Sequence, residues 1–199
     1  MKMKRWSAIF GAVLLCTTPF KAYSLDRKPD GISLTGGDGL NKRSELSNFR
    51  AAVRWDWDAD LLNSRNWRLD GYFDLGYSQW KSRLSREDQP TSDGAKKAWQ
   101  VSLTPVFRLS PKTDNAIVPF VDFGVGVSYQ SKKNLEKESR SPLRMGGHTQ
   151  FEGRLMVGFQ FGDQHDYEIA YGWFHYSNAS LHPNNDGLDF QMLSFVMKW

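Results

Sequence analysis

Eight segments of this chain place apolar side chains at every second position, and this period of two restricts the chain to β-strands. The pattern is clearest where Val121, Phe123 and Val125 alternate with Asp122 and Gly124. Turns rich in Gly, Pro, Asn and Asp separate the segments, and none of the segments follows the helical period of 3.6. The sequence predicts an all-β protein with strands over residues 31–39, 47–57, 66–80, 97–110, 116–130, 148–162, 166–177 and 187–199.

The polar face of these segments carries charges of both signs beside small residues. A narrow barrel lumen crossed by salt bridges needs this mixture, and the apolar face of each strand then turns toward lipid. We therefore predict an eight-stranded antiparallel transmembrane β-barrel of the bacterial outer membrane. The expected lumen charges are Arg50, Arg54, Asp56, Arg68, Asp70, Asp74, Asp122, Glu152, Arg154 and Glu168.

The connections between the segments differ in length, and this predicts the orientation of the barrel. Residues 58–65, 111–115 and 163–165 form short connections, whereas the other connections are longer and more polar. In bacterial outer-membrane barrels the short turns and both termini face the periplasm, and the long loops face outside. Aromatic residues near both expected rims suit two interface girdles: Trp55, Trp57, Trp67 and Trp199 at the inner rim, and Tyr77, Trp99 and Tyr129 at the outer rim.

The first 24 residues have the order of a secretory signal. Met1–Arg5 carries three positive charges, an apolar stretch follows, and Ala22-Tyr23-Ser24 has small residues where a signal peptidase reads them. We predict a cleaved signal peptide over residues 1–24 and a single barrel domain over residues 25–199. Removal of this leader lowers the count of Lys and Arg from 26 to 22, equal to the 22 Asp and Glu, so the charge gives no support for nucleic-acid binding.

Three polar residues interrupt the apolar face of the last two segments. His175 and Ser177 follow Trp173 on the outward face, and the same parity in the final segment leads to Asp189. A hairpin symmetric about His182 pairs residue 175 with residue 189, because both lie seven positions from its centre. The three side chains then form a Ser–His–Asp constellation of nucleophile, base and orienting acid. The alternative is that all three simply lie at the edge of the hydrocarbon, where polar residues cost little.

The same residues carry a resemblance to a known family. His175-Tyr176-Ser177-Asn178-Ala179, followed by Asn185-Asp186-Gly187-Leu188-Asp189, resembles the signature of the lipid A 3-O-deacylases, the PagL family. The resemblance implies that His175, Ser177 and Asn178 fall on the family's invariant triplet and Phe151 on its conserved aromatic. Further similar stretches are Trp55-Asp56-Trp57-Asp58, Gly71-Tyr72, Gly76-Tyr77, Pro105-Val106-Phe107, Pro119-Phe120, Gly124 with Gly126, and Phe151-Glu152.

Two positions depart from the pattern of that family. Asp189 stands where better-known members have glutamate, which is one methylene longer, and Ser180 stands where some have glycine. The resemblance implies a serine-hydrolase site on the outer wall of the barrel, facing the outer leaflet of a Gram-negative outer membrane. It also implies removal of the 3-hydroxyacyl chain at position 3 of lipid A.

We assign roles to the candidate residues on this basis. Ser177 is the expected nucleophile, His175 the base and Asp189 the acid. Backbone N–H groups of the turn over residues 178–181, including those of Ala179 and Ser180, are expected to bind the oxyanion together with the Asn185 side chain, and Phe151 is expected to line the acyl-chain groove. We expect lipopolysaccharide as the substrate, no cofactor and no metal, and the sequence is compatible with a homodimer.

Two other functions remain open from the sequence. One is a non-enzymatic small barrel, an adhesin or structural protein, whose strands only anchor its loops. The other is an outer-membrane phospholipase built on the same scaffold.

Overall fold

The computed structural model describes residues 28–40, 45–57, 59–88, 90, 93–138 and 141–199. The predicted signal peptide, residues 1–24, lies outside this range. In the part of the chain that is described, no helix combines the length and the hydropathy needed to cross a membrane.

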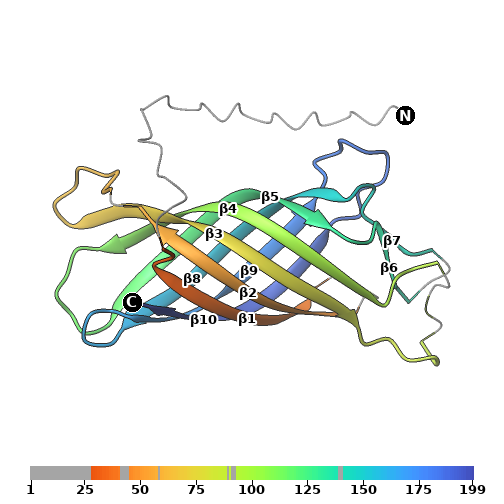
Figure 1. The fold of residues 1–199 in the computed structure, drawn as a ribbon, viewed down its shortest axis with the longest axis horizontal. Coiled ribbons are helices and arrows are strands. Elements are labelled where there is room, and N and C mark those ends of the chain that lie inside the picture. Colours follow the sequence, from red (N-terminus) through yellow and green to blue (C-terminus); the bar gives the residue numbers. More distant parts are fainter. Residues whose placement is uncertain (1–27, 41–44, 58, 89, 91–92, 139–140) are drawn as a thin grey trace, which may run out of the picture.

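Eight long strands form one closed antiparallel barrel, in the order β1-β10-β9-β8-β5-β4-β3-β2 (Figure 1). The fold class predicted from the alternation is confirmed, and every strand begins and ends within two residues of its predicted bounds. The added feature is a two-stranded sheet, β6 with β7, inside the connection between β5 and β8. The bounds are β1 Gly31–Gly39, β2 Leu46–Asp56, β3 Trp67–Ser82, β4 Lys97–Pro111, β5 Val118–Gln130, β6 Asn134–Leu135, β7 Leu143–Arg144, β8 Thr149–Phe161, β9 Tyr167–Ser177 and β10 Leu188–Lys198.

Burial alternates along the strands in the direction expected of a membrane barrel. In β5, Phe123, Val125 and Val127 are 45%, 68% and 53% exposed, whereas the neighbouring Asp122, whose side chain lies in the lumen, is 2% exposed. The apolar side chains therefore cover the outer wall and the charged side chains lie inside. A water-soluble barrel would have the opposite arrangement.

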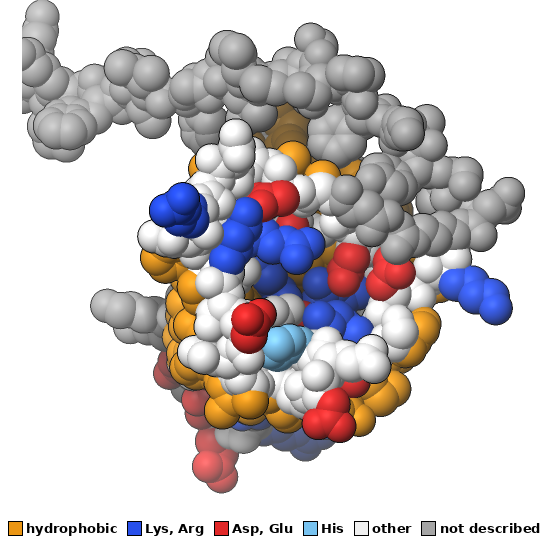
Figure 2. All heavy atoms as spheres, turned by 90° about the vertical axis from the view of Figure 1, so that its left-hand side faces the viewer, with side chains coloured by type: hydrophobic (Ala, Val, Ile, Leu, Met, Phe, Trp, Pro, Cys, Tyr) orange, Lys and Arg blue, Asp and Glu red, His pale blue; other side chains and the backbone are white. Residues whose placement is uncertain are grey.

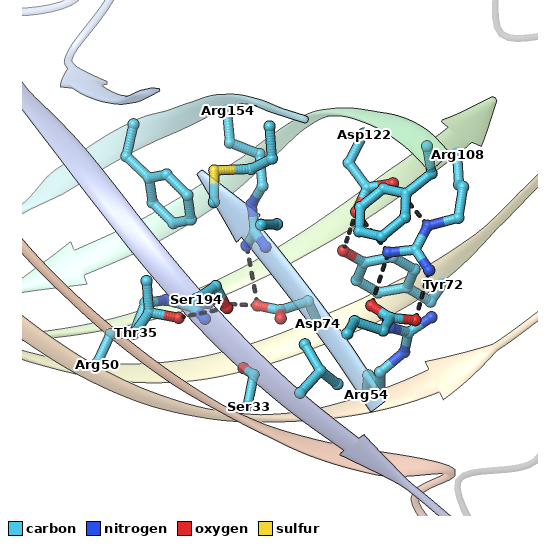
Figure 3. A pocket seen from close by; sticks show the side chains of 16 residues that line it. Ser33, Thr35, Arg50, Arg54, Tyr72, Asp74, Arg108, Asp122, Arg154 and Ser194 are labelled. Atoms are coloured by element: carbon cyan, nitrogen blue, oxygen red, sulfur yellow. Dashed lines mark hydrogen bonds and ion pairs between the residues drawn. The ribbon is translucent and has the colours of Figure 1, made fainter. Parts of the chain in front are cut away.

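Paired charges fill the lumen. Glu168 accepts hydrogen bonds from Arg54 at 2.9 Å and from Arg108 at 2.5 Å, and Arg108 also binds both oxygens of Asp122 at 2.7 Å. The Tyr72 hydroxyl donates to Asp122 at 2.8 Å (Figure 3). Each buried ion thus has partners of opposite charge, the condition under which a low-dielectric interior tolerates it.

A second group of charges adjoins the first. Asp74 lies between the guanidinium groups of Arg50 and Arg154, and Arg154 also binds Glu152 at 2.6 Å. The Tyr176 hydroxyl donates to Glu152 at 3.0 Å. The cavity between these two groups holds only about 30 Å³, room for about one water molecule, so side chains close the lumen at this level.

The two ends of the barrel differ as the loop lengths predict. Gly31 pairs with Lys198, so the start of β1 and the end of β10 lie together, at the end of the barrel that also carries the short turns. Figure 2 looks onto this end, where Lys, Arg, Asp and Glu side chains surround a hollow and a hydrophobic rim encircles it. The opposite end carries the β9–β10 connection and the β6–β7 sheet (Figure 1).

One aromatic residue departs from the predicted girdle. Trp67 and Trp199 are exposed, but Trp57 is only 6% exposed. Its ring packs edge-on against Phe73 and Phe107 at centroid distances of 5.4 and 5.0 Å, over the space left by Gly71. Glycine is required there, because an added Cβ would lie 2.5 Å from the Trp57 ring.

The charged lumen makes a stability prediction. Glu168→Gln removes the negative charge that faces two buried guanidinium groups, and we expect the free energy of unfolding to fall by about 3–5 kcal/mol. Urea unfolding in lipid vesicles measures this difference. The control is Asp163→Asn in the exposed turn between β8 and β9, which should change it by less than about 0.5 kcal/mol. Equal losses in the two variants would contradict a stabilising role for the lumen charges.

Candidate active site

The register of the β9–β10 hairpin brings a histidine and an acid together on the outer wall. His175 is the direct partner of Asp189, as a hairpin symmetric about His182 requires. The His175 Nδ1–H donates to Asp189 Oδ1 at 2.8 Å, and the two side chains are 33% and 31% exposed. Because this bond uses Nδ1, the other ring nitrogen, Nε2, points away from the acid.

Ser177 lies two residues farther along β9 on the same outward face and ends the strand. Its register partner across the β8–β9 pair is Phe151, so the aromatic ring and the hydroxyl emerge side by side. Within the described residues, no hydrogen bond joins Ser177 to His175. The structure therefore pairs His175 with Asp189 and places Ser177 and Phe151 beside them.

Small neighbours leave room around the imidazole. Gly153 is the β8 partner of His175 and offers no side chain on that flank. Gly187 approaches from the loop, where an added Cβ would stand 3.4 Å from Cε1 of His175, and its φ of +68° suits glycine. Trp173 stacks on the imidazole with ring centroids 5.4 Å apart. The ring is thus packed against Trp173, while Gly153 and Gly187 place no side chain against it.

The loop after Ser177 is clamped by Asn178, which is fully buried. Its side-chain Nδ2 donates to the carbonyl oxygens of Met145 at 2.9 Å and Asn184 at 2.7 Å. Gly146 lies against this contact, since a Cβ there would stand 2.0 Å from the Asn184 carbonyl oxygen. The turn that carries the candidate oxyanion donors is therefore held by the segment that follows β7.

A second clamp lies closer to β10. Asp186 accepts a hydrogen bond from the Arg144 N–H at 2.8 Å through its side chain, and its own N–H donates to the Arg144 carbonyl at 3.0 Å. Asp186 consequently fixes the loop to the backbone of Arg144, whereas Asp189 faces His175.

Two of the expected oxyanion donors are already engaged. The Asn178 N–H donates to Asn185 Oδ1 at 3.0 Å, and the Leu181 N–H donates to the Asn178 carbonyl at 2.9 Å. Asn185 thus uses its side chain as an acceptor inside the loop. Within the described residues, the N–H groups of Ala179 and Ser180 make no hydrogen bond, so they remain as the candidate donors.

Ala179 and Ser180 adopt an uncommon backbone conformation. Their φ angles are +49° and +64°, in the left-handed region that non-glycine residues rarely enter. Such strain costs of order 1 kcal/mol or more per residue and concentrates at functional sites, where surrounding contacts enforce it. Here the Asn178 and Asp186 clamps on either side provide that enforcement.

Sequence reasoning missed two contributors to this site. One is Trp173, which belongs to the apolar outward series of β9 but also contacts both His175 and Asp189. Its position two residues before the histidine, on the same face, was the available signal. The other is the 143–147 segment, for which the sequence offers no signal, because its contacts with the 178–187 loop depend on tertiary structure.

Comparison with known structures supports the same architecture. A crystal structure of the outer membrane enzyme PagL matches with a TM-score of 0.68 and 26% identity, covering 85% of this chain and 99% of that one. Neisserial surface protein A matches with a TM-score of 0.51 and 9% identity, covering 85% and 95%, and this likeness concerns the fold alone. The barrel and its likeness to the PagL structure identify an outer-membrane protein.

Sequence comparison identifies the family. Lipid A deacylase PagL of Pseudomonas aeruginosa is 30% identical over 158 residues, covering 79% of this chain and 78% of the relative. Lipid A deacylase PagL of Bordetella bronchiseptica is 26% identical over 198 residues, covering 99% and 98%. The family model for lipid A 3-O-deacylase (PagL) matches residues 47–198, which include every strand from β3 to β10 and the whole candidate site. This chain therefore belongs to the lipid A 3-O-deacylase (PagL) family.

Proposed function

We propose that this chain hydrolyses the ester that joins a 3-hydroxyacyl chain to position 3 of lipid A, and that it does so as a serine hydrolase. The observation that carries the mechanism is the 2.8 Å hydrogen bond between His175 and Asp189, with Ser177 on the same outward face. A base held by an acid beside a hydroxyl is the arrangement that activates a serine nucleophile.

The reaction proceeds in two steps. His175 Nε2 takes the proton of Ser177 as Oγ attacks the ester carbonyl, and the tetrahedral intermediate then collapses to an acyl-enzyme. The departing sugar hydroxyl receives the proton from His175. Water, activated by the same imidazole, releases the 3-hydroxy fatty acid and restores Ser177. Asp189 holds the Nδ1–H tautomer and stabilises the imidazolium that forms in each step.

Proton transfer requires His175 Nε2 to come within about 2.6–3.2 Å of Ser177 Oγ. Side chains two positions apart on one strand face lie about 6–7 Å apart at their backbone, a gap that rotation of the serine and imidazole can close. Catalytic hydrogen bonds are often long before substrate binds and tighten in the complex. The free Ala179 and Ser180 N–H groups then supply the oxyanion site.

The site lies at the end of the barrel opposite the termini, and we assign this end to the outer leaflet. Long loops face outside in outer-membrane barrels, and lipopolysaccharide occupies that leaflet. A site on the lipid-facing wall is reached from within the membrane plane. Phe151, beside Ser177 and half-buried, is positioned to contact the acyl chain of such a substrate.

Loss of the nucleophile or the base tests the mechanism. Ser177→Ala and His175→Ala should each lower deacylation by roughly 10³-fold or more, since neither the oxyanion donors nor binding can replace the attacking group. Both side chains lie outside the packed lumen, so the variants should keep the heat-dependent gel mobility of a folded barrel. The measurement is mass spectrometry of lipid A after incubation with each purified variant.

The controls are Ser64→Ala and His165→Ala in the short turns at the opposite end, which should retain wild-type activity. Full activity of Ser177→Ala would exclude the proposed nucleophile. If the wild-type protein left lipid A intact but released acyl chains from phospholipids, the chain would be a phospholipase. If it changed neither lipid, a structural or adhesive role would replace the proposal.

The acid is tested by comparing two aspartates. Asp189→Asn should lower kcat by roughly 10²–10⁴-fold, because an amide no longer selects the productive imidazole tautomer. Asp189→Glu should retain substantial activity, since it keeps the carboxylate. Asp186→Asn should have little effect, because an amide oxygen can still accept the Arg144 N–H bond. An inactive Asp186→Asn beside a fully active Asp189→Asn would reassign the acid.

A further inference from the structure

Asp189 receives a second hydrogen bond from a residue that none of the catalytic roles above includes. The indole Nε1–H of Trp173 donates to Asp189 Oδ1 at 2.9 Å, the same oxygen that accepts from His175 at 2.8 Å. Trp173 is the register partner of Gln191, so its ring reaches diagonally across the β9–β10 pair to arrive at residue 189. Two donors therefore converge on one carboxylate oxygen.

The indole also contacts the base. Its ring stacks on the His175 imidazole with centroids 5.4 Å apart and planes inclined by 25°. Trp173 is 41% exposed on the outer wall. It lies two residues before His175 on the same face of β9, so it flanks the acid–base pair on the side toward the middle of the strand. The same side chain thus constrains both partners of the hydrogen bond.

A second diagonal hydrogen bond joins β9 to β10 beside this one, but it does not involve His175, Ser177 or Asp189. The Tyr171 hydroxyl donates to Gln191 Oε1 at 3.0 Å, again from β9 to a polar side chain on β10. Tyr171 lies two residues before Trp173 on the same face. Tyr171 is therefore a matched control for Trp173: it donates a hydrogen bond from β9 to β10 but does not contact Asp189.

A carboxylate on a lipid-facing wall needs such donors. Charges facing hydrocarbon are costly unless they are paired, and the imidazole is neutral before it takes the serine proton. The aspartate side chain is also short, so its carboxylate reaches His175 only in a suitable rotamer. A second donor on Oδ1 selects the rotamer that points the carboxylate at Nδ1 of His175, and so fixes the plane of the imidazole.

We propose that Trp173 is a positioning residue that holds Asp189 against His175 through its indole N–H. This inference rests on the proposed serine-hydrolase function. Trp173 acts on the reaction through the acid, so its loss should lower kcat while KM stays near the wild-type value. Residues that bind substrate directly would instead raise KM.

The test is Trp173→Phe, which removes the N–H but keeps an aromatic ring to stack on His175. We expect kcat for lipid A deacylation in detergent micelles to fall by roughly tenfold or more, as for loss of a hydrogen bond to a charged group. The matched control, Tyr171→Phe, removes the neighbouring interstrand donor and should leave kcat unchanged. Wild-type kcat in Trp173→Phe would overturn the inference while leaving Ser177 and His175 in place.

A double-mutant cycle separates positioning from substrate contact. In an Asp189→Ala background the indole has no carboxylate to hold, so adding Trp173→Phe should cause no further loss. Rescue is the complementary readout: Asp189→Glu combined with Trp173→Phe should be less impaired than Trp173→Phe alone, because the longer acid reaches His175 unaided. Additive losses in the Asp189→Ala background would show that Trp173 acts elsewhere. Full activity of Asp189→Ala would instead overturn the proposed triad itself.

Discussion

Hydrogen bonding between the backbones of neighbouring strands is the constraint on which the rest of this structure depends. Hydrocarbon offers no water to satisfy N–H and C=O groups, so each membrane-spanning strand needs a partner on both sides and β10 must close onto β1. The alternation of apolar and polar residues fixes the register of every pair, since a slip of one residue would exchange the two faces of a strand. The facing pair His175 and Asp189 follows from that register.

The two faces of the barrel handle polar groups in different ways. Inside, Arg108 and Glu168 are buried among partners of opposite charge, which fill the lumen and give the wall a rigid support. Outside, His175 and Asp189 are each about one-third exposed, and they find their partners on adjacent strands. The candidate site is thus a short polar seam in an otherwise apolar wall.

The residues of this seam come from two kinds of structure, the paired strands β9 and β10 and the clamped loop that follows Ser177. His175 and Asp189 are held by strands, while Ser177 stands where β9 ends and the loop begins. Asn178 then ties that loop to the Met145 carbonyl, so the left-handed turn after the serine has a defined position. A proposed oxyanion site depends on such preorganisation, because donors that must move first contribute less to the rate.

Most of the architecture could be predicted from the sequence, because strand periodicity is local. Alternation predicts all eight strands to within two residues, and equal spacing about His182 places residue 175 opposite residue 189, as the structure has them. Loop lengths likewise predicted which end holds the termini. These features depend on the order of nearby residues. The period of two also leaves little choice of strand register, because a slip of one residue would turn the apolar side chains to the other face.

Tertiary structure decided the contacts that join segments distant in the chain or depend on a side-chain rotamer. The clamp from Asn178 to Met145, the burial of Trp57 over Gly71 and the bond from Trp173 to Asp189 belong to this class. It also decided which N–H groups of the turn stay unbonded. Parity alone assigns a side chain to a face, and only packing decides what that side chain touches there.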